Sequence, residues 1–193
     1  MIASLNILFQ TRKTFDYLDD QFEDDLETNC TFIFGLLGAI GGLNSFFKER
    51  AHFIDFSDSR FLILFLIAAI AFGAVFGVLI GKYLQTYVLF GVGRLLKGSA
   101  EVIDIRVVAA YSLIPGILRL PVIIYLGTTD NASLSSEFFL IINILTYIIW
   151  IWTLKIMLQG IMRFNKFGIL KALINISPIL IPGLIWGGIR LLG

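Results

Sequence analysis

The stretch GRLLKGSAEVIDIRVVAAYSLIPGILRLP, residues 93–121, governs how the rest of the chain is interpreted. It begins as a charged connection and continues as an apolar run that Pro115, Arg119 and Pro121 interrupt. A proline inside a helix costs about 3 kcal/mol or more, because it removes a backbone donor. An arginine in the middle of a membrane span costs about 2.5–3.5 kcal/mol on insertion scales. A span that carries such residues is therefore the first place to search for a function.

The run predicts a helix that Ser99 caps and that presents one distinctive face. Five candidate functional or packing residues lie on this face or beside it: Tyr111, Pro115 and Arg119 at a spacing of four, and the small residues Ser112 and Gly116. Two positions are open for Arg119. Either it points into the helix bundle, toward Asn143, a freed carbonyl or a lipid phosphate, or the helix breaks near Pro115 and Arg119 reaches the membrane interface.

The composition of the whole chain indicates a multi-pass membrane protein. Of its 193 residues, 58% are hydrophobic, and the mean hydropathy is +0.88. The apolar residues gather in runs close to the roughly 20 residues that cross a bilayer. We therefore expect an all-α, five-span transmembrane helix bundle over residues 30–193, with spans at about 30–47, 61–92, 101–127, 137–162 and 172–192.

Residues 1–29 read as a separate, amphipathic and acidic N-terminal helix. Its apolar residues recur at helical spacing, with carboxylates between them: Phe15, Leu18, Phe22 and Leu26. Thr11 or Thr14 could cap this helix. An acidic face gains nothing from anionic lipid, so we expect it either to be solvated or to contact a protein partner at the cytoplasmic face.

Glycines at helical spacing predict close packing between spans. The helix-packing candidates are Gly35 and Gly38 in the first span, and Gly73, Gly77 and Gly81 in the second. These stripes could also support a homo-oligomer. The first span is short enough that a re-entrant hairpin is an alternative, whereas the second is long enough to tilt, bend or project beyond the bilayer.

The last span is interrupted by Pro178 and Pro182, and Pro182 lies in a Leu-Ile-Pro-Gly sequence that also surrounds Pro115. Paired interrupted helices can mark a binding site in transporters, although six apolar residues can also match by chance or through shared packing.

The distribution of basic residues predicts the topology. With five spans, the N-terminus and the connections at 93–106 and 163–171 together carry eight Lys or Arg residues, against four on the other side. The positive-inside rule then places the N-terminus in the cytoplasm and the C-terminus outside. The basic 163–171 connection could bind acidic lipid or the acidic N-terminal helix.

The residue inventory argues against an enzyme. Cys30 and His52 are the sole cysteine and histidine of the chain, so neither a disulfide nor a zinc site of the usual spacing can form. His52, Asp55 and Asp58 lie in a polar connection that we interpret as an ordinary loop. We expect no catalytic residues, no cofactor, no metal and no nucleic-acid partner.

Several motifs resemble those of the Yip domain (Ypt-interacting protein) family in its short bacterial form. The resemblance rests on the linker 93–98, the run Arg106 to Pro115, the late residues Trp152, Gly160 and Lys171-Ala172, and the N-terminal entry 11–15. It implies a five-span bundle in a bacterial inner membrane with a cytoplasmic N-terminus. Eukaryotic relatives bind Rab-type GTPases, but this chain lacks their Tyr-Gly-Pro-like motif, which argues against that role here.

Two functions follow from these observations. The first is a non-enzymatic membrane-organising or adaptor protein, which the resemblance and the charged cytoplasmic face favour. The alternative is a small transporter, channel or lipid-translocating protein that uses the interrupted third span around Arg119.

Overall fold

The computed structural model describes residues 2–53, 59–129 and 135–192, and these residues form helices and short connections without a strand. In chain order the elements are α1 (Ile2–Phe9), α2 (Thr11–Asp19), α3 (Glu23–Phe53), α4 (Ser59–Val78), η1 (Leu79–Gln85), α5 (Thr86–Leu95), α6 (Val102–Ser112), η2 (Ile114–Arg119), α7 (Leu120–Thr128), α8 (Ser136–Asn165) and α9 (Ile169–Leu192). The expectation of an all-α protein is therefore confirmed.

Four helices are long and apolar enough to cross a membrane: Glu23–Glu49, Arg60–Leu95, Val102–Thr128 and Ser136–Asn165. A shorter apolar helix covers Ile169–Ile185. By the length and composition of its helices, the chain is thus an integral, multi-pass membrane protein.

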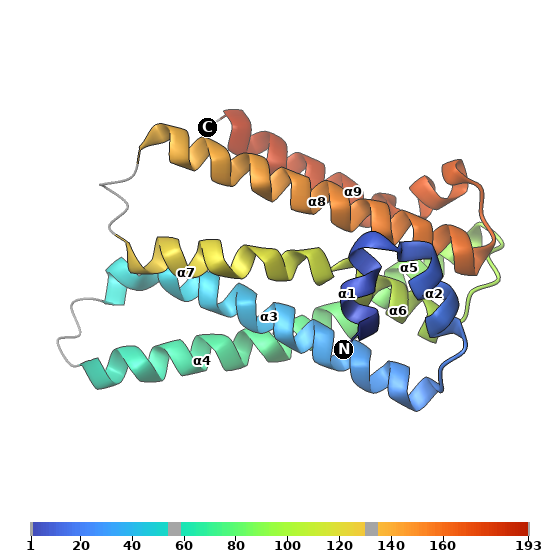
Figure 1. Ribbon diagram of the computed structural model, residues 1–193, viewed down its shortest axis with the longest axis horizontal. Helices are drawn as coiled ribbons and strands as arrows, with labels where there is room; N and C mark the ends of the chain where they lie inside the picture. Colours follow the sequence, from blue (N-terminus) through green and yellow to red (C-terminus); the bar gives the residue numbers. More distant parts are fainter. Residues whose placement is uncertain (1, 54–58, 130–134, 193) are drawn as a thin grey trace.

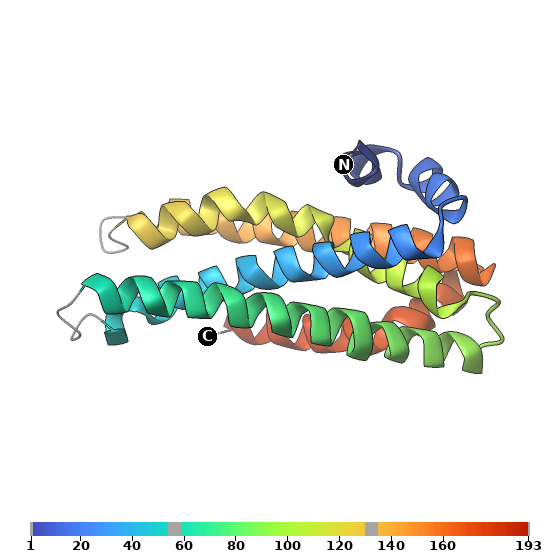
Figure 2. The same ribbon diagram turned by 90° about the horizontal axis from the view of Figure 1, so that it is seen from below.

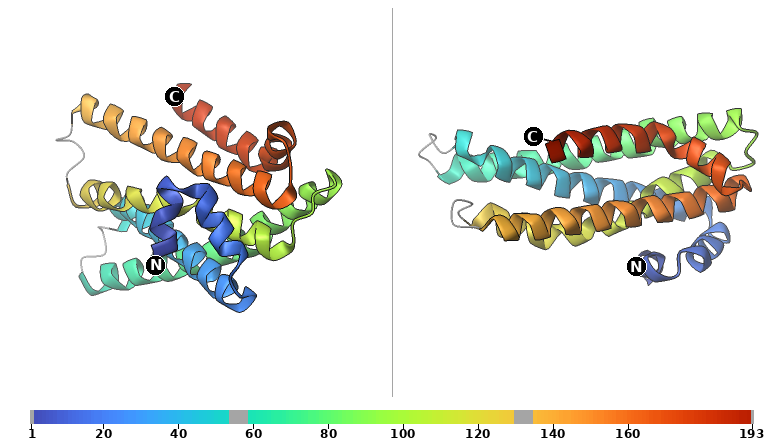
Figure 3. Two further views of the ribbon diagram at one scale, coloured as in Figure 1. Left: turned by 45° about the vertical axis from the view of Figure 1, so that its right-hand side comes forward. Right: turned by 90° about the horizontal axis from the view of Figure 1, so that it is seen from above.

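The long helices lie side by side in an elongated bundle (Figures 1 and 2). The connections from α2 to α3, from α5 to α6 and from α8 to α9 all lie at one end, which we call the connection end (Figure 1). The α1–α2 pair lies outside the bundle near this end (Figure 3). Segments far apart in sequence therefore meet at the connection end.

Helix α6 forms the centre of the bundle. Its residues from Val107 to Ser112 are all buried, together with Ile105. Half of the apolar window of Val102–Thr128 is buried inside the protein, whereas none of the window of Arg60–Leu95 is. The second span therefore turns most of its apolar side chains outward, where hydrocarbon rather than water meets them.

Helices α3 and α4 pack at glycines. A Cβ built on Gly77 would lie 2.6 Å from the Cα of Gly38, and one built on Gly73 would lie 2.8 Å from the Cα of Gly42. Gly35 has only ordinary contact with Val78, at 3.6 Å. The stripe thus lies between two helices of one chain, and a second copy could use it only by separating them.

Gly81 is the third glycine of the stripe on the second span. The phenyl ring of Phe34 on α3 fills the space beside it, where a side chain would otherwise lie. No turn interrupts α3 between Cys30 and Phe47, so the segment for which we considered a re-entrant hairpin is a continuous helix.

The first long helix begins earlier than the expected start of the first span at residue 30. Glu23, Asp24 and Asp25 form its first turn, where the helix dipole favours negative charge. The acidic segment 1–29 is consequently divided among α1, α2 and the start of α3. The predicted caps were wrong as well. The N-cap of α2 is Gln10, and the hydroxyls of Thr11 and Thr14 donate instead to the carbonyls of Ile7 in α1 and of Gln10.

The prediction that Ser99 caps the third span was also wrong. The N-cap is Glu101, whose backbone N–H donates to the Asp104 carboxylate at 2.7 Å. The Ser99 hydroxyl instead donates to the carbonyl of Phe164 at 3.1 Å and thereby ties the α5–α6 connection to the end of α8.

The second long helix runs without a break from Ser59 to Leu95, but η1 within it is a π-helix. At about 1.5 Å per residue, this helix is about 55 Å long, well beyond the roughly 30 Å of hydrocarbon. The π-helical turns lie where the helix passes the start of α3 and α6, and they contain its lysine, Lys82.

Candidate functional site

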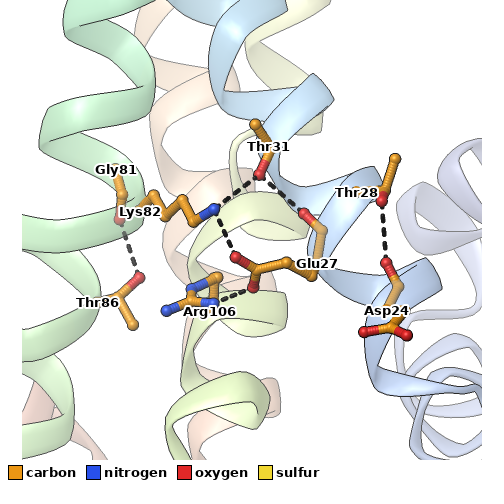
Figure 4. A network of polar contacts seen from close by, with 8 residues as sticks. All are labelled: Asp24, Glu27, Thr28, Thr31, Gly81, Lys82, Thr86 and Arg106. Atoms are coloured by element: carbon orange, nitrogen blue, oxygen red, sulfur yellow. Dashed lines mark hydrogen bonds and ion pairs between the residues drawn. The ribbon is translucent and has the colours of Figure 1, made fainter.

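Three charged side chains from three helices converge near the connection end (Figure 4). They are Glu27 on α3, Lys82 on η1 and Arg106 on α6. The Lys82 ammonium lies 2.5 Å from one carboxylate oxygen of Glu27, and the Arg106 guanidinium donates to the other. We call these residues the charged triad. Each carboxylate oxygen of Glu27 thus has its own cationic partner.

Local structure holds each member of the charged triad in place. One turn after Glu27, the Thr31 hydroxyl donates to the Glu27 carbonyl at 2.9 Å and accepts a hydrogen bond from Lys82 at 3.3 Å. Lys82 lies in the π-helix, whose wider turns change the direction of the side chains that follow. π-helical turns of this kind are often found at functional sites.

The charged triad is largely shielded from solvent. The side chains of Arg106 and Lys82 are only 12% and 17% exposed, and that of Glu27 is 35% exposed. The Nε of Arg106 is buried and has no hydrogen-bond partner among the described residues. Removing one partner of a buried ion pair is strongly destabilising, because the remaining charge stays desolvated. The triad therefore couples the positions of α3, η1 and α6.

The sequence analysis missed this charged triad. Glu27 falls in the segment 1–29, which the sequence predicts to be a separate acidic helix. One signal was present: a lysine in the middle of a long apolar run is a candidate for an intramembrane ion pair.

A second set of ion pairs joins the N-terminal helices to the bundle. The Arg163 guanidinium on α8 donates to Asp16 at 2.6 Å and to Asp19 at 3.2 Å. The Trp152 indole donates to the Leu8 carbonyl at 3.1 Å. Of the two partners considered for the basic connection, the acidic N-terminal helix is thus the one that Arg163 contacts.

Apolar contacts supply most of the attachment of the N-terminal helices. Phe15 is fully buried and packs edge-on against Phe164, with ring centroids 5.9 Å apart. Leu18 is 2% exposed. The ion pairs of Arg163 are 40–50% exposed and contribute at most about 1 kcal/mol. The burial of Phe15 and Leu18 therefore contributes more to the attachment of α2 than the ion pairs of Arg163 do.

Two open cavities, of about 510 and 590 Å³, flank the start of α6 at the connection end. Glu23 and Glu101 line both, with Arg163 beside the first and Arg94 beside the second. Within residues 2–53, 59–129 and 135–192, no group of three or more His, Cys, Asp or Glu is arranged to hold a metal ion. Of the possible ligands in the 52–58 connection, Asp55 and Asp58 lie outside the described residues.

The structure changes the predicted face of the third span. Pro115 lies in the first turn of a 3₁₀ stretch, η2, in which side chains three residues apart align. Tyr111, Ser112 and Pro115 are buried, whereas Arg119 is exposed and aligns instead with Leu113 and Gly116. The spacing-of-four face does not form, because the helix changes its period at the proline.

Arg119, Leu113 and Gly116 line a cavity of about 290 Å³ between α3, η2 and α8. Asn143 is exposed and is not among the residues that line it. Pro178 and Pro182 lie inside the α-helix α9. The stretch around Pro182 therefore differs in conformation from the similar stretch around Pro115, which is a 3₁₀-helix.

A model of the Yip1 domain matches residues 5–189, nearly the whole chain. The chain belongs to the Yip1 domain family. No match to a curated protein or to a solved structure was found.

The linker that carries the family resemblance is a packing site in this Yip1 domain. The side-chain amides of Asn165 and Asn175 lie beside Gly93, within 3.1–3.4 Å of a Cβ built there. Asn165 also accepts a hydrogen bond from the backbone of Ala100, and Asn175 donates to the Leu89 carbonyl. Both amides are buried, at 4% and 0% exposure. Glycine leaves the room that these amides need.

Lys97 in the same linker adopts a left-handed conformation, with φ of 64°. The Gly98 N–H then donates to the Gly93 carbonyl at 2.8 Å and closes the end of α5 as a Schellman motif. Lys166 closes α8 in the same way, with φ of 53°. The linker of this Yip1 domain therefore combines a helix stop with a helix contact.

Proposed function

We propose that this Yip1 domain protein is a non-enzymatic membrane-organising or adaptor protein. The observation that carries the proposal is the docking of α2 onto α8 through Phe15 and Arg163. This docking holds an acidic surface at the connection end, made of residues that are all exposed: Asp20, Glu23, Asp24 and Asp25. A basic segment of another protein is the partner that fits this surface. Yip1 domain proteins are generally non-enzymatic, which agrees with this role.

We propose further that the protein has five spans, with the N-terminus in the cytoplasm and the C-terminus outside, in a bacterial inner membrane. Helix α9 returns alongside α8 and is 24 residues long, about 36 Å at the usual helical rise. The connection end also gathers the basic connections, as the positive-inside rule requires of a cytoplasmic side.

Site-specific photocrosslinking in cells tests the adaptor role. A photoreactive residue at Asp20 or Asp24 should give a discrete crosslinked adduct, and the same residue at Glu49, near the other end of α3, should not. The adduct should disappear when Asp25 is replaced by lysine, because a basic partner would then be repelled. Equal adducts at both ends, or none at the acidic surface, would argue against the proposal.

The alternative, a small transporter, channel or lipid-translocating protein, draws support from the cavity at Arg119. Protein reconstituted into liposomes would show solute flux or lipid movement that Arg119→Leu reduces. Identical rates for the wild type and this variant would exclude a function of that kind based on Arg119.

A further inference from the structure

The cavity at Arg119 is a partly open site with a mostly apolar lining, and it lies between three candidate membrane spans. Gly41 and Asn44 line it from α3, Arg119 from the end of η2, and Thr146, Trp150 and Thr153 from α8. These three spans are Glu23–Glu49, Val102–Thr128 and Ser136–Asn165. Apolar side chains make up most of the rest of the lining, so the cavity combines a few polar groups with apolar walls, as ligand sites usually do.

The cavity lies at one depth in all three helices. Asn44, Arg119 and Thr146 are each nine or ten residues from the helix end opposite the connection end, at Phe53, Thr128 and Ser136 respectively. At about 1.5 Å per residue, this places the cavity roughly 14 Å below that end. The site is therefore within reach of molecules that enter from one leaflet.

The chemistry of the lining favours an oxyanion. Arg119 is the one charged residue among the described residues that line the cavity. A guanidinium offers several donors in a planar fork that fits phosphate oxygens. The Asn44 amide and the Trp150 indole can donate as well. Several donors around one space suit a phosphate group, and phospholipids present this group from within the bilayer.

The size of the cavity agrees with a headgroup rather than a whole lipid. Its volume is about 290 Å³, at the lower edge of the range for ligand pockets, roughly 300–1,000 Å³. Gly41 leaves space open, since a Cβ built there would meet no atom within 4 Å. The acyl chains would remain outside among the helices, where exposed apolar side chains are abundant.

We propose that this cavity binds the phosphate group of a membrane phospholipid, with Arg119 as the charged ligand-binding residue. The proposal goes beyond the adaptor role and does not depend on it, because a bound lipid needs no protein partner. It also requires no lipid translocation, so a failed flux assay leaves it standing.

Native mass spectrometry of the delipidated full-length protein in detergent tests the proposal. Phosphatidylglycerol is titrated alongside diacylglycerol, which has the same chains without the phosphate. The wild type should bind phosphatidylglycerol at least about tenfold more tightly than diacylglycerol. Arg119→Leu should lose about ten- to a hundredfold of this affinity, as expected for hydrogen bonds to a charged group.

Matched variants separate ligand loss from misfolding. Gly41→Leu keeps Arg119 but fills the cavity, and it should weaken binding by a similar factor. Gly91→Leu is its control, because Gly91 is also exposed with no atom within 4 Å of a built Cβ. Lys155→Leu removes a cation from α8 at a residue that is not among those lining the cavity. Both controls should stay within about twofold of the wild type.

The contrary results are distinct. Equal binding of phosphatidylglycerol and diacylglycerol, or wild-type affinity in both Arg119→Leu and Gly41→Leu, would overturn the proposal. Inorganic phosphate that binds in an Arg119-dependent way, without any phosphatidylglycerol binding, would show a site for free phosphate and overturn the lipid as its source.

Discussion

Replacing Glu27 with glutamine should destabilise the protein more than any other single change in the charged triad. Glu27 is the shared partner of Lys82 and Arg106. Without its charge, two cations that are less than a fifth exposed face each other across a neutral amide. Replacing Lys82 with methionine, in contrast, leaves Glu27 paired with Arg106, so that no charge loses its only partner.

The expected magnitudes follow from burial. Breaking a fully buried ion pair by removing one partner costs about 3–5 kcal/mol. Because the Glu27 side chain is 35% exposed, solvent screens part of this loss, and we expect about 2–3 kcal/mol for Glu27→Gln. Lys82→Met should cost about 1 kcal/mol or less, since the methionine keeps most of the packing of the lysine stem.

Thermal unfolding in detergent, followed by loss of monodisperse protein, measures the difference. For a chain of this size, 1 kcal/mol corresponds to about 2–4 °C in Tm. Glu27→Gln should therefore lower Tm by about 4–12 °C, and Lys82→Met by about 4 °C at most. A Lys82→Met variant as unstable as Glu27→Gln, or a Glu27→Gln variant with wild-type Tm, would refute the role of Glu27 as the shared partner.

Three further predictions test other contacts by the same Tm measurement. Gly77→Ala should cost about 1–3 kcal/mol, because its Cβ would lie 2.6 Å from Gly38 Cα. Gly41→Ala, with open space around it, should be neutral or slightly stabilising. Equal effects of the two substitutions would contradict the packing of α3 on α4. Lys97→Gly should stabilise by about 0.5–1 kcal/mol, since glycine adopts positive φ without strain, and a lower Tm would contradict the helix stop described for the linker. Phe15→Ala should cost about 3–5 kcal/mol, whereas Arg163→Gln should cost at most about 1 kcal/mol. A larger loss of stability for Arg163→Gln than for Phe15→Ala would show that charge rather than burial attaches α2.

Local patterns in the sequence were sufficient for the class of the protein and for much of its layout. Runs of apolar residues identify the spans because a bilayer imposes a minimum length on each helix. The linker at 93–98 and the run to Pro115 carry the family resemblance, which the match over residues 5–189 confirms. These features depend on neighbours in the chain, so they can be read without a structure.

The limits of helices and the period within them were harder to predict. Helix α3 already begins at Glu23 and includes the acidic residues that follow it. The reason is that a buried face continues through Leu26 and Cys30 into the span. Pro115 does not merely kink an α-helix: it lies in a 3₁₀ stretch that begins at Ile114, and the changed period rotates Arg119 away from Tyr111. Both outcomes depend on packing against other helices, which outweighs local propensity.

The sequence by itself thus determined that this is a helical Yip1 domain membrane protein with glycine stripes and an interrupted third span. Only the tertiary structure decided which charges meet. Glu27 and Arg106 are 79 residues apart, and each alone resembles an ordinary charge near a helix end. An ion pair depends on distance and burial in three dimensions, and helical periodicity contains no information about either between separate helices. The same reason applies to Arg119, whose neighbours in the cavity come from three spans.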